Sequence, residues 1–203
     1  MRVEVRADGK TVVIDGYVNA VERESRPVIT PRGRCNEKVK EGTFKKALER
    51  AENVDILLDH DNSKKYGSTS EKNLQLFEDN IGLRAIATIC DEEIADKAKS
   101  GKLKGWSFGM YVNKDAYEER ADKLPLRTLE DIDIFEVSMI DEKMNPCYTA
   151  TSIETRANGE EKVIEQRAND THVVTENMVE TPKETIDYSK YENRAKALSQ
   201  PEG

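Results

Sequence analysis

The chain has 203 residues, of which 36% are hydrophobic and 35% are charged, and its formal net charge at pH 7 is -8. This length allows one hydrophobic core with an extension. An acidic chain without a clustered basic face is poorly suited to a phosphate backbone, so we expect no nucleic-acid partner. No apolar stretch approaches the length of a membrane span and no signal peptide is recognisable, so we expect no membrane partner.

Three cysteines, Cys35, Cys90 and Cys147, form an odd-numbered set without metal-ligand spacing. The only imidazoles are His60 and His172, so we expect no zinc or other metal site. We also expect reduced thiols, as in a cytosolic protein. Cys90 ends an apolar run and is expected to be buried.

Apolar periodicity and turn residues predict a largely β chain with two helices. We expect first a β-hairpin, a loop with a short extended piece, a helix, a buried strand and a polar loop, over residues 2–21, 24–42, 42–54, 54–61 and 61–73. We then expect a second hairpin, a second helix, a strand and one or two closing strands, over residues 74–90, 91–105, 103–112 and 124–140. Thr43 and Asp91 are expected to cap the two helices.

The composition changes after residue 153. Large apolar residues become rare and no period holds, which predicts a linker or disordered segment. Helical spacing returns over residues 184–198, where a partner-binding helix and an isolated marginal helix both remain open. We therefore expect a mostly β domain at residues 1–153, followed by an acidic linker and tail at residues 154–203 with a possible terminal helix.

The stretch LKGWSFGMYV, residues 103–112, places a serine among large apolar residues. Strand alternation points Trp106 and Phe108 to one side, which is typical of a core face. The other side carries Ser107 between Gly105 and Gly109. Glycine inside a strand often marks a close approach of another group. Ser107 therefore either fills a tight packing position or is reached by a partner.

Two further residues could carry chemistry. His60 follows the apolar run VDILLD, and its strand parity points it to the interior, where a satisfied core histidine is the alternative to a functional one. Glu136 lies in DIDIFEVSMI, where the apolar phase slips near residue 134, so a bulge is expected that would re-aim a side chain. A solvated outer face is the alternative for Glu136. Together, a serine, an imidazole and a carboxylate form a known catalytic set, although sequence separation says nothing of distance.

Five stretches occur in one order along about residues 10–153: GTFKKAL, VDILLDHD with YGSTS, GLRAIATI, KGWSFGM and FEVSMIDEKMNP. In this order they resemble the prohead proteases of tailed phages, the capsid maturation proteases, which are related in fold to the herpesvirus assemblin proteases. His60 matches the family's histidine, Ser107 matches its glycine-flanked serine, and Glu136 matches its acidic residue before a Val-Ser pair.

This resemblance implies a mostly β (α+β) fold, with a small assemblin-like antiparallel β-barrel, flanking helices and a partly disordered or helical tail. It implies a serine endopeptidase in which Ser107 is the nucleophile, His60 is the general base and Glu136 orients His60. The substrates would be the major capsid protein or a scaffold protein, or both, and the protease itself. It also implies a homodimer, no cofactor, and action inside the assembling prohead in the host cytoplasm.

Two alternatives remain. The chain could be a non-catalytic capsid-assembly or scaffolding protein on the same fold, in which the acidic tail carries the function. It could also be a β binding module unrelated to capsids. The intact set of His60, Ser107 and Glu136 favours the protease over the first alternative. The second alternative does not explain why glycines flank Ser107 on its strand face.

Overall fold

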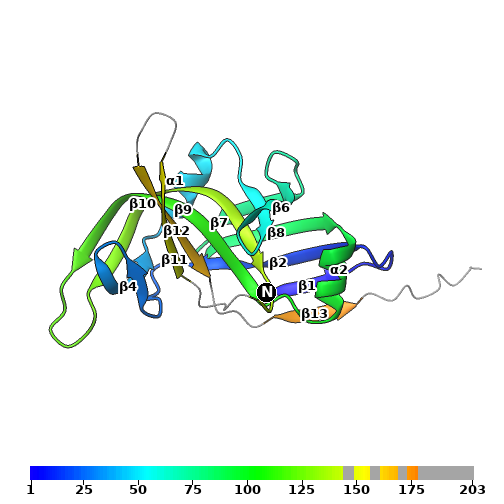
Figure 1. Cartoon of the computed structure of the whole chain (residues 1–203), viewed down its shortest axis with the longest axis horizontal. Coiled ribbons are helices and arrows are strands. Elements are labelled where there is room, and N and C mark those ends of the chain that lie inside the picture. The colour runs from blue at the N-terminus through cyan, green and yellow to red at the C-terminus, as the bar shows by residue number, and fades with distance from the viewer. Residues whose placement is uncertain (144–148, 156–160, 169–172, 178–203) are drawn as a thin grey trace, which may run out of the picture.

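Strands make up most of the described chain, which comprises residues 1–143, 149–155, 161–168 and 173–177 of this computed structural model (Figure 1). One sheet has the strand order β13-β1-β2-β8-β7. Neighbours in it pair antiparallel, except that β13 runs parallel to β1. Both predicted hairpins are confirmed in this sheet. Its strands are β1 (Arg2–Val5), β2 (Thr11–Ala20), β7 (Leu74–Glu78), β8 (Gly82–Cys90) and β13 (Val174–Asn177).

The second sheet has the order β11-β12-β9-β10-β4-β3, and β5 pairs with both β10 and β6 beside this path. Its strands are β3 (Val28–Thr30), β4 (Gly33–Val39), β5 (Asp55–Leu58), β6 (Asp61–Ser68), β9 (Gly105–Glu118), β10 (Leu126–Ile140), β11 (Thr149–Thr155) and β12 (Glu161–Ala168). β6 corrects the loop predicted for residues 61–73, because backbone pairing with β5 orders this segment although its side chains are mostly exposed.

The mostly β, α+β class is confirmed, but the predicted antiparallel barrel is corrected to two open sheets within the described residues. A single bridge between Val21 and Val39 links the sheets, and no ladder continues from it. The cause lies in β10, whose one edge pairs with β4 over Leu126–Leu129 and with β5 over Glu136–Met139. Because two strands share this edge, the sheet branches there instead of closing.

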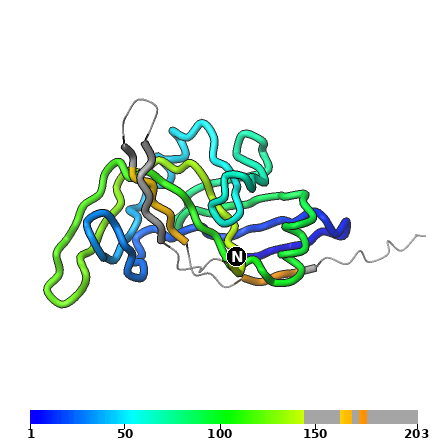
Figure 2. The backbone as a smooth tube through the Cα atoms, viewed as in Figure 1, coloured from blue at the N-terminus to red at the C-terminus, as the bar shows by residue number. Residues whose placement is uncertain are grey.

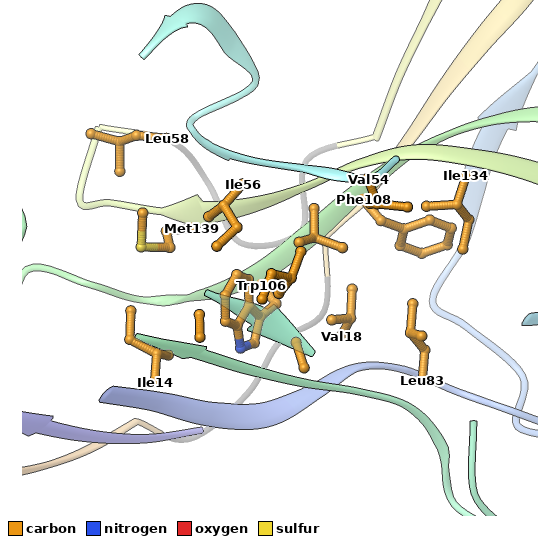
Figure 3. Close-up of a cluster of buried hydrophobic side chains, with 14 of the residues drawn as sticks. Ile14, Val18, Val54, Ile56, Leu58, Leu83, Trp106, Phe108, Ile134 and Met139 are labelled. Atoms are coloured by element: carbon orange, nitrogen blue, oxygen red, sulfur yellow. The ribbon is translucent and has the colours of Figure 1, made fainter. Parts of the chain in front are cut away.

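The hydrophobic core lies between the two sheets (Figure 3). Trp106 and Phe108 of β9 face Ile14 and Val18 of β2 across it, and all four side chains are fully buried. The predicted core face of the serine strand is therefore confirmed. Burial of each such side chain contributes roughly 1.5–3 kcal/mol, so this packing holds β9 firmly at its inner face.

Two short helices, α1 (Thr43–Arg50) and α2 (Glu92–Lys99), flank the sheets. Asp91 caps α2 as predicted, because its carboxylate accepts a backbone N–H from the first turn. Thr43 does not cap α1. Its hydroxyl points instead to the carbonyl oxygen of Leu129, which ties the helix to β10. Within the described ranges, no helix combines the length and the apolar composition needed to cross a bilayer.

Two strands lie in the region predicted to be a linker. β12 pairs with β9, and β13 lies beside β1 near the N-terminus (Figure 2). The prediction of an unstructured segment is therefore wrong for these residues, because the alternation of VIEQRA reflects a strand with a buried charged face. The division into residues 1–153 and 154–203 stays a prediction, and the helix expected over 184–198 lies outside the described residues.

The cysteines in the described residues are free thiols, with Cys35 buried and Cys90 exposed. The predicted burial of Cys90 is wrong, because Cys90 is the last residue of β8 and the alternation of that strand turns it outward. Cys147 lies outside the described residues.

Candidate active site

His60 lies in the tight turn between β5 and β6. Leu58 pairs with Asp61, so Asp59 and His60 are the two turn residues, and their φ angles are 54° and 60°. Two left-handed residues in a two-residue hairpin are typical of a type I′ turn, where glycine usually takes the second position. The parity argument for His60 is therefore corrected, because the histidine lies beyond the strand end. A side chain in this region costs about 1–2 kcal/mol, which the surroundings must offset.

The end of β10 provides that support. Asp59 N donates to Met139 O at 2.9 Å, and Asp141 N donates to Asp59 Oδ1 at 2.9 Å. His60 N donates to Ser138 Oγ at 3.1 Å. These bonds fix the backbone of both turn residues, so the position of the imidazole follows from the position of β10.

A second pair of carboxyl groups lies under this turn. Burial raises the pKa of Asp59, whose carboxylate lies next to Asp141. Burial acts in the same direction on Asp141, but the hydrogen bonds from Lys97 and from the backbone N–H of Lys143, with the positive charge of Lys97, together hold the pKa of Asp141 below its usual value. Lys97 Nζ donates to Asp141 Oδ2 at 2.7 Å, so α2 is also tied to the turn.

Ser107 lies on the face of β9 opposite the core, and it pairs with Ser138 of β10. Ser107 is completely buried. The glycine at position 109 has a clear steric reason, because a Cβ there would overlap with Glu136 Oε1 and lie 2.6 Å from Cζ of Phe135. The close approach that the glycines indicated is therefore made by the carboxylate of Glu136.

Glu136 owes its direction to the predicted bulge, which is confirmed. Pairing between β9 and β10 shifts register between Ile134 and Glu136, so Phe135 is the extra residue. The shift lets Ile134 and Val137 both face the core. Glu136 is thereby turned to the same side as Ser107.

The three residues singled out from the sequence form one hydrogen-bonded chain. Ser107 Oγ lies 2.7 Å from His60 Nε2. His60 Nδ1 lies 2.7 Å from Glu136 Oε1. The exposed fractions of the His60 and Glu136 side chains are 5% and 3%, so these contacts are shielded from water, which strengthens them.

Ser138 is a fourth member that the sequence analysis did not identify. Its hydroxyl donates to Glu136 Oε2 at 2.6 Å and accepts the N–H of His60 at 3.1 Å. One buried hydroxyl thus joins the carboxylate to the backbone of the histidine that this carboxylate orients. The only signal in the sequence is that Ser138 lies two residues after Glu136 and so shares its strand face.

On the inner face of the sheet lies a second polar cluster, which we call the ion-pair network: Glu37 (β4), Arg127 (β10), Glu165 and Arg167 (β12). Arg127 donates to Glu37 at 3.0 Å and to both carboxylate oxygens of Glu165 at 2.7 and 2.8 Å. Arg167 contacts Glu165 and donates to Glu37 at 2.7 and 3.2 Å. All four are buried. Sequence reasoning missed this network because its charged residues suggested a solvated segment.

A serine hydroxyl on an imidazole, with a carboxylate on the second ring nitrogen, is the arrangement that serine hydrolases use. The imidazole accepts the hydroxyl proton, and the carboxylate fixes the tautomer and stabilises the imidazolium. No group of three or more His, Cys, Asp or Glu side chains suited to a metal ion occurs in the described part of the chain.

Comparison with known protein families supports the same class of protein, the serine hydrolases. Residues 1–166 match the family described as Caudovirus prohead serine protease. The chain belongs to this family, as its sequence motifs indicated. No curated protein and no solved structure matches the chain.

Proposed function

We propose that this protein is a serine endopeptidase that cleaves capsid or scaffold proteins, and itself, inside the immature prohead during capsid maturation. The observation that carries the proposal is the continuous hydrogen-bonded chain from Ser107 through His60 to Glu136. Membership in the prohead serine protease family supports the same chemistry. The setting that follows is the assembling prohead in the host cytoplasm.

In the proposed reaction, Ser107 Oγ attacks the scissile carbonyl carbon while His60 Nε2 takes the hydroxyl proton. The resulting imidazolium is stabilised by Glu136 and gives this proton to the leaving amine, which produces an acyl-enzyme on Ser107. Water then attacks the ester, with His60 again as the base, and the free serine and a carboxylic acid are formed. Ser138 keeps Glu136 and the turn of His60 in place throughout.

Coexpression with the capsid protein tests the proposal. The wild-type chain should shorten the capsid protein and its own chain, whereas Ser107→Ala should leave both intact by gel and intact mass. Loss of a catalytic serine lowers turnover by at least about 10⁴-fold, while little volume is removed from the fold. Identical fragments with both chains would eliminate Ser107 as nucleophile.

The same experiment tests the scaffolding alternative. If capsids assemble and neither the wild-type chain nor Ser107→Ala cleaves any protein, the scaffolding alternative replaces the proposed protease. Homodimerisation stays a prediction, and light scattering of the purified chain measures it directly.

A further inference from the structure

β12 lies along one edge of β9, next to the candidate nucleophile. Residues Ile164 to Ala168 pair antiparallel with Tyr111 to Ser107, and Ala168 is directly opposite Ser107. The other edge of β9 is taken by β10. Because β10 takes that edge, an extended peptide that pairs along β9 as far as Ser107 needs the place that β12 fills.

β12 is held at its inner face by charged side chains. Glu165 bonds Arg127, and Arg167 bonds Glu37. Buried ion pairs of this kind add little net stability, because desolvation offsets most of their attraction. They do specify register, since a shift by one residue would turn both charges to the opposite face.

Removal of β12 leaves no charge of the ion-pair network without a partner of opposite sign. Glu165 and Arg167 contact each other and leave together as a neutral pair. Arg127 keeps its bonds to Glu37 at 3.0 Å and to Asp115 at 2.7 Å. The large cost of stranding a buried charge therefore does not oppose the exchange of this strand.

The packing around β12 is also incomplete. A cavity of about 250 Å³ borders Arg167 and Ala168, and another of about 310 Å³ borders Val163 and Glu165. Trp106 and Phe108 on the core face of β9 line neither cavity. β12 thus borders two cavities, one shared with β2 and β4 and the other with β9.

We propose that the edge of β9 that pairs with β12 is the peptide-binding edge of this protein, and that β12 occupies it until a substrate segment displaces it. This inference rests on the proposed function. Addition of a strand to a sheet edge supplies affinity through the backbone and specificity through alternate side chains. β12 and an incoming extended segment thus compete for the same hydrogen-bonding groups of β9.

The ion-pair network then defines the chemistry of the preferred segment. A strand in the register of β12 places one side chain near Arg127, the next inner side chain near Glu37, and the following residue opposite Ser107. The preferred pattern is therefore an acidic residue, any residue, a basic residue and a small residue, as in Glu165, Gln166, Arg167 and Ala168. Glu37 and Arg127 are the specificity-determining residues of this edge.

A reversible lock on β12 tests the exchange in the full-length chain. The double variant Tyr111→Cys with Ile164→Cys places two thiols at directly opposed positions of β9 and β12. Disulfide formation, verified by intact mass, should abolish cleavage of the capsid protein, and dithiothreitol should restore it. The reduced form of the same protein is the reference, and the two single variants under the same oxidant control for oxidation elsewhere.

A fluorophosphonate separates the two possible failures. An activated Ser107 oxygen displaces fluoride from this reagent and is labelled, whereas Ser107→Ala is not. Equal cleavage of the capsid protein by the locked and the reduced forms would overturn the inference and leave the proposed function standing. Absence of both labelling and cleavage in every form would remove the proposed function and the inference with it.

Two peptides test the side-chain pattern. EKVIEQRA, the sequence of residues 161–168, should inhibit capsid cleavage by the wild-type chain. The peptide with Glu165→Arg and Arg167→Glu should require about tenfold more for the same inhibition, because two attractive charge contacts become repulsive. Equal potency of the two peptides would overturn the assignment of Glu37 and Arg127.

Discussion

The two buried polar clusters of this protein lie on opposite faces of β9 and are built in different ways. The cluster of His60, Ser107, Glu136 and Ser138 is a chain of hydrogen bonds on a strained turn and a bulge. The ion-pair network is a set of balanced charges on regular strands.

The difference shows what each cluster depends on. The first cluster depends on shape. The bulge directs the carboxylate of Glu136, the turn positions the imidazole of His60, and Gly109 leaves room for that carboxylate. The second depends on charge balance, because each of its members has a partner of opposite sign. The first should therefore be sensitive to an added methyl group, and the second to the loss of one charge.

Gly109→Ala should have the largest effect, and the effect should fall on activity. The added Cβ would collide with Glu136 Oε1 and push the carboxylate away from His60. Loss of the orienting carboxylate costs about 10³–10⁴-fold in turnover. Cleavage of the capsid protein by the purified variant measures this loss.

Gly101→Ala is the matched control. Gly101 differs from Gly109 in having a positive φ, 66°, but a Cβ there meets nothing within 4 Å. This variant should lose about 1 kcal/mol of stability through its backbone and keep its cleavage rate. Similar losses of activity in both variants would refute the steric role of position 109.

Arg127→Met should produce the next largest effect, and here the effect should fall on stability. The substitution leaves Glu37 and Glu165 buried with one positive partner, Arg167, between them. Breaking a buried pair in this way costs about 3–5 kcal/mol of the free energy of unfolding. Denaturant unfolding of the purified chain measures it.

An ion pair on the surface provides the control for this loss of stability. Arg50 bridges Asp131 and Asp133, but its side chain is 43% exposed. Arg50→Met should cost at most about 1 kcal/mol, because water screens surface pairs. Equal losses for Arg127→Met and Arg50→Met would mean that burial contributes nothing to the network.

The same contrast explains what the sequence could predict. The alternation around Ser107, the glycine at 109 and the phase slip before Glu136 are local patterns, and each corresponds to a feature of the candidate active site. The bond from His60 N to Ser138 was missed because it joins residues far apart in the chain, whereas the bond from Ser138 to Glu136 joins neighbours on one strand face. The ion-pair network was missed because Glu165 and Arg167 are hidden only once β12 pairs with β9.

Local sequence patterns also could not predict whether the second sheet closes into a barrel. In the second sheet, β5, β9 and β10 could be recognised from their apolar patterns. The segment of β3 and β4 was expected to be a loop with a short extended piece, β6 a loop and β12 a linker, and β11 was not predicted. Which strands share an edge of β10 depends on pairing between distant segments. The barrel was therefore inferred from resemblance, and the branched edge of β10 replaces it.

Ser138→Ala should have a smaller effect on activity than Gly109→Ala. It removes one hydrogen bond to Glu136 and one to His60 N, but it leaves both side chains in place. Loss of about 1–3 kcal/mol corresponds to a roughly 5–150-fold lower kcat. Ser138→Cys, which keeps a weak donor, should recover part of the rate. An unchanged kcat in Ser138→Ala would show that Glu136 needs no second anchor.

The smallest predicted effect is the loss of stability that the ion-pair network suffers in acid. Burial raises the pKa of Glu165, but the bonds from Arg127 and Arg167 outweigh it and hold that pKa below the ordinary 4.5. The stabilisation is thus complete above pH 4.5 and is lost as the pH falls through the lower folded value. The difference in thermal midpoint between wild type and Glu165→Gln should shrink over this range. A constant difference would contradict the shift.

The position of β10 in the chain also determines when the residues of the candidate active site can come together during synthesis. His60 and Ser107 precede it in the chain, whereas Glu136 and Ser138 lie near its end at Ile140. During synthesis from the N-terminus, the first two leave the ribosome well before the residues that orient them. A nascent chain therefore carries a serine and a histidine without an assembled site until the last residues of β10 have emerged and paired.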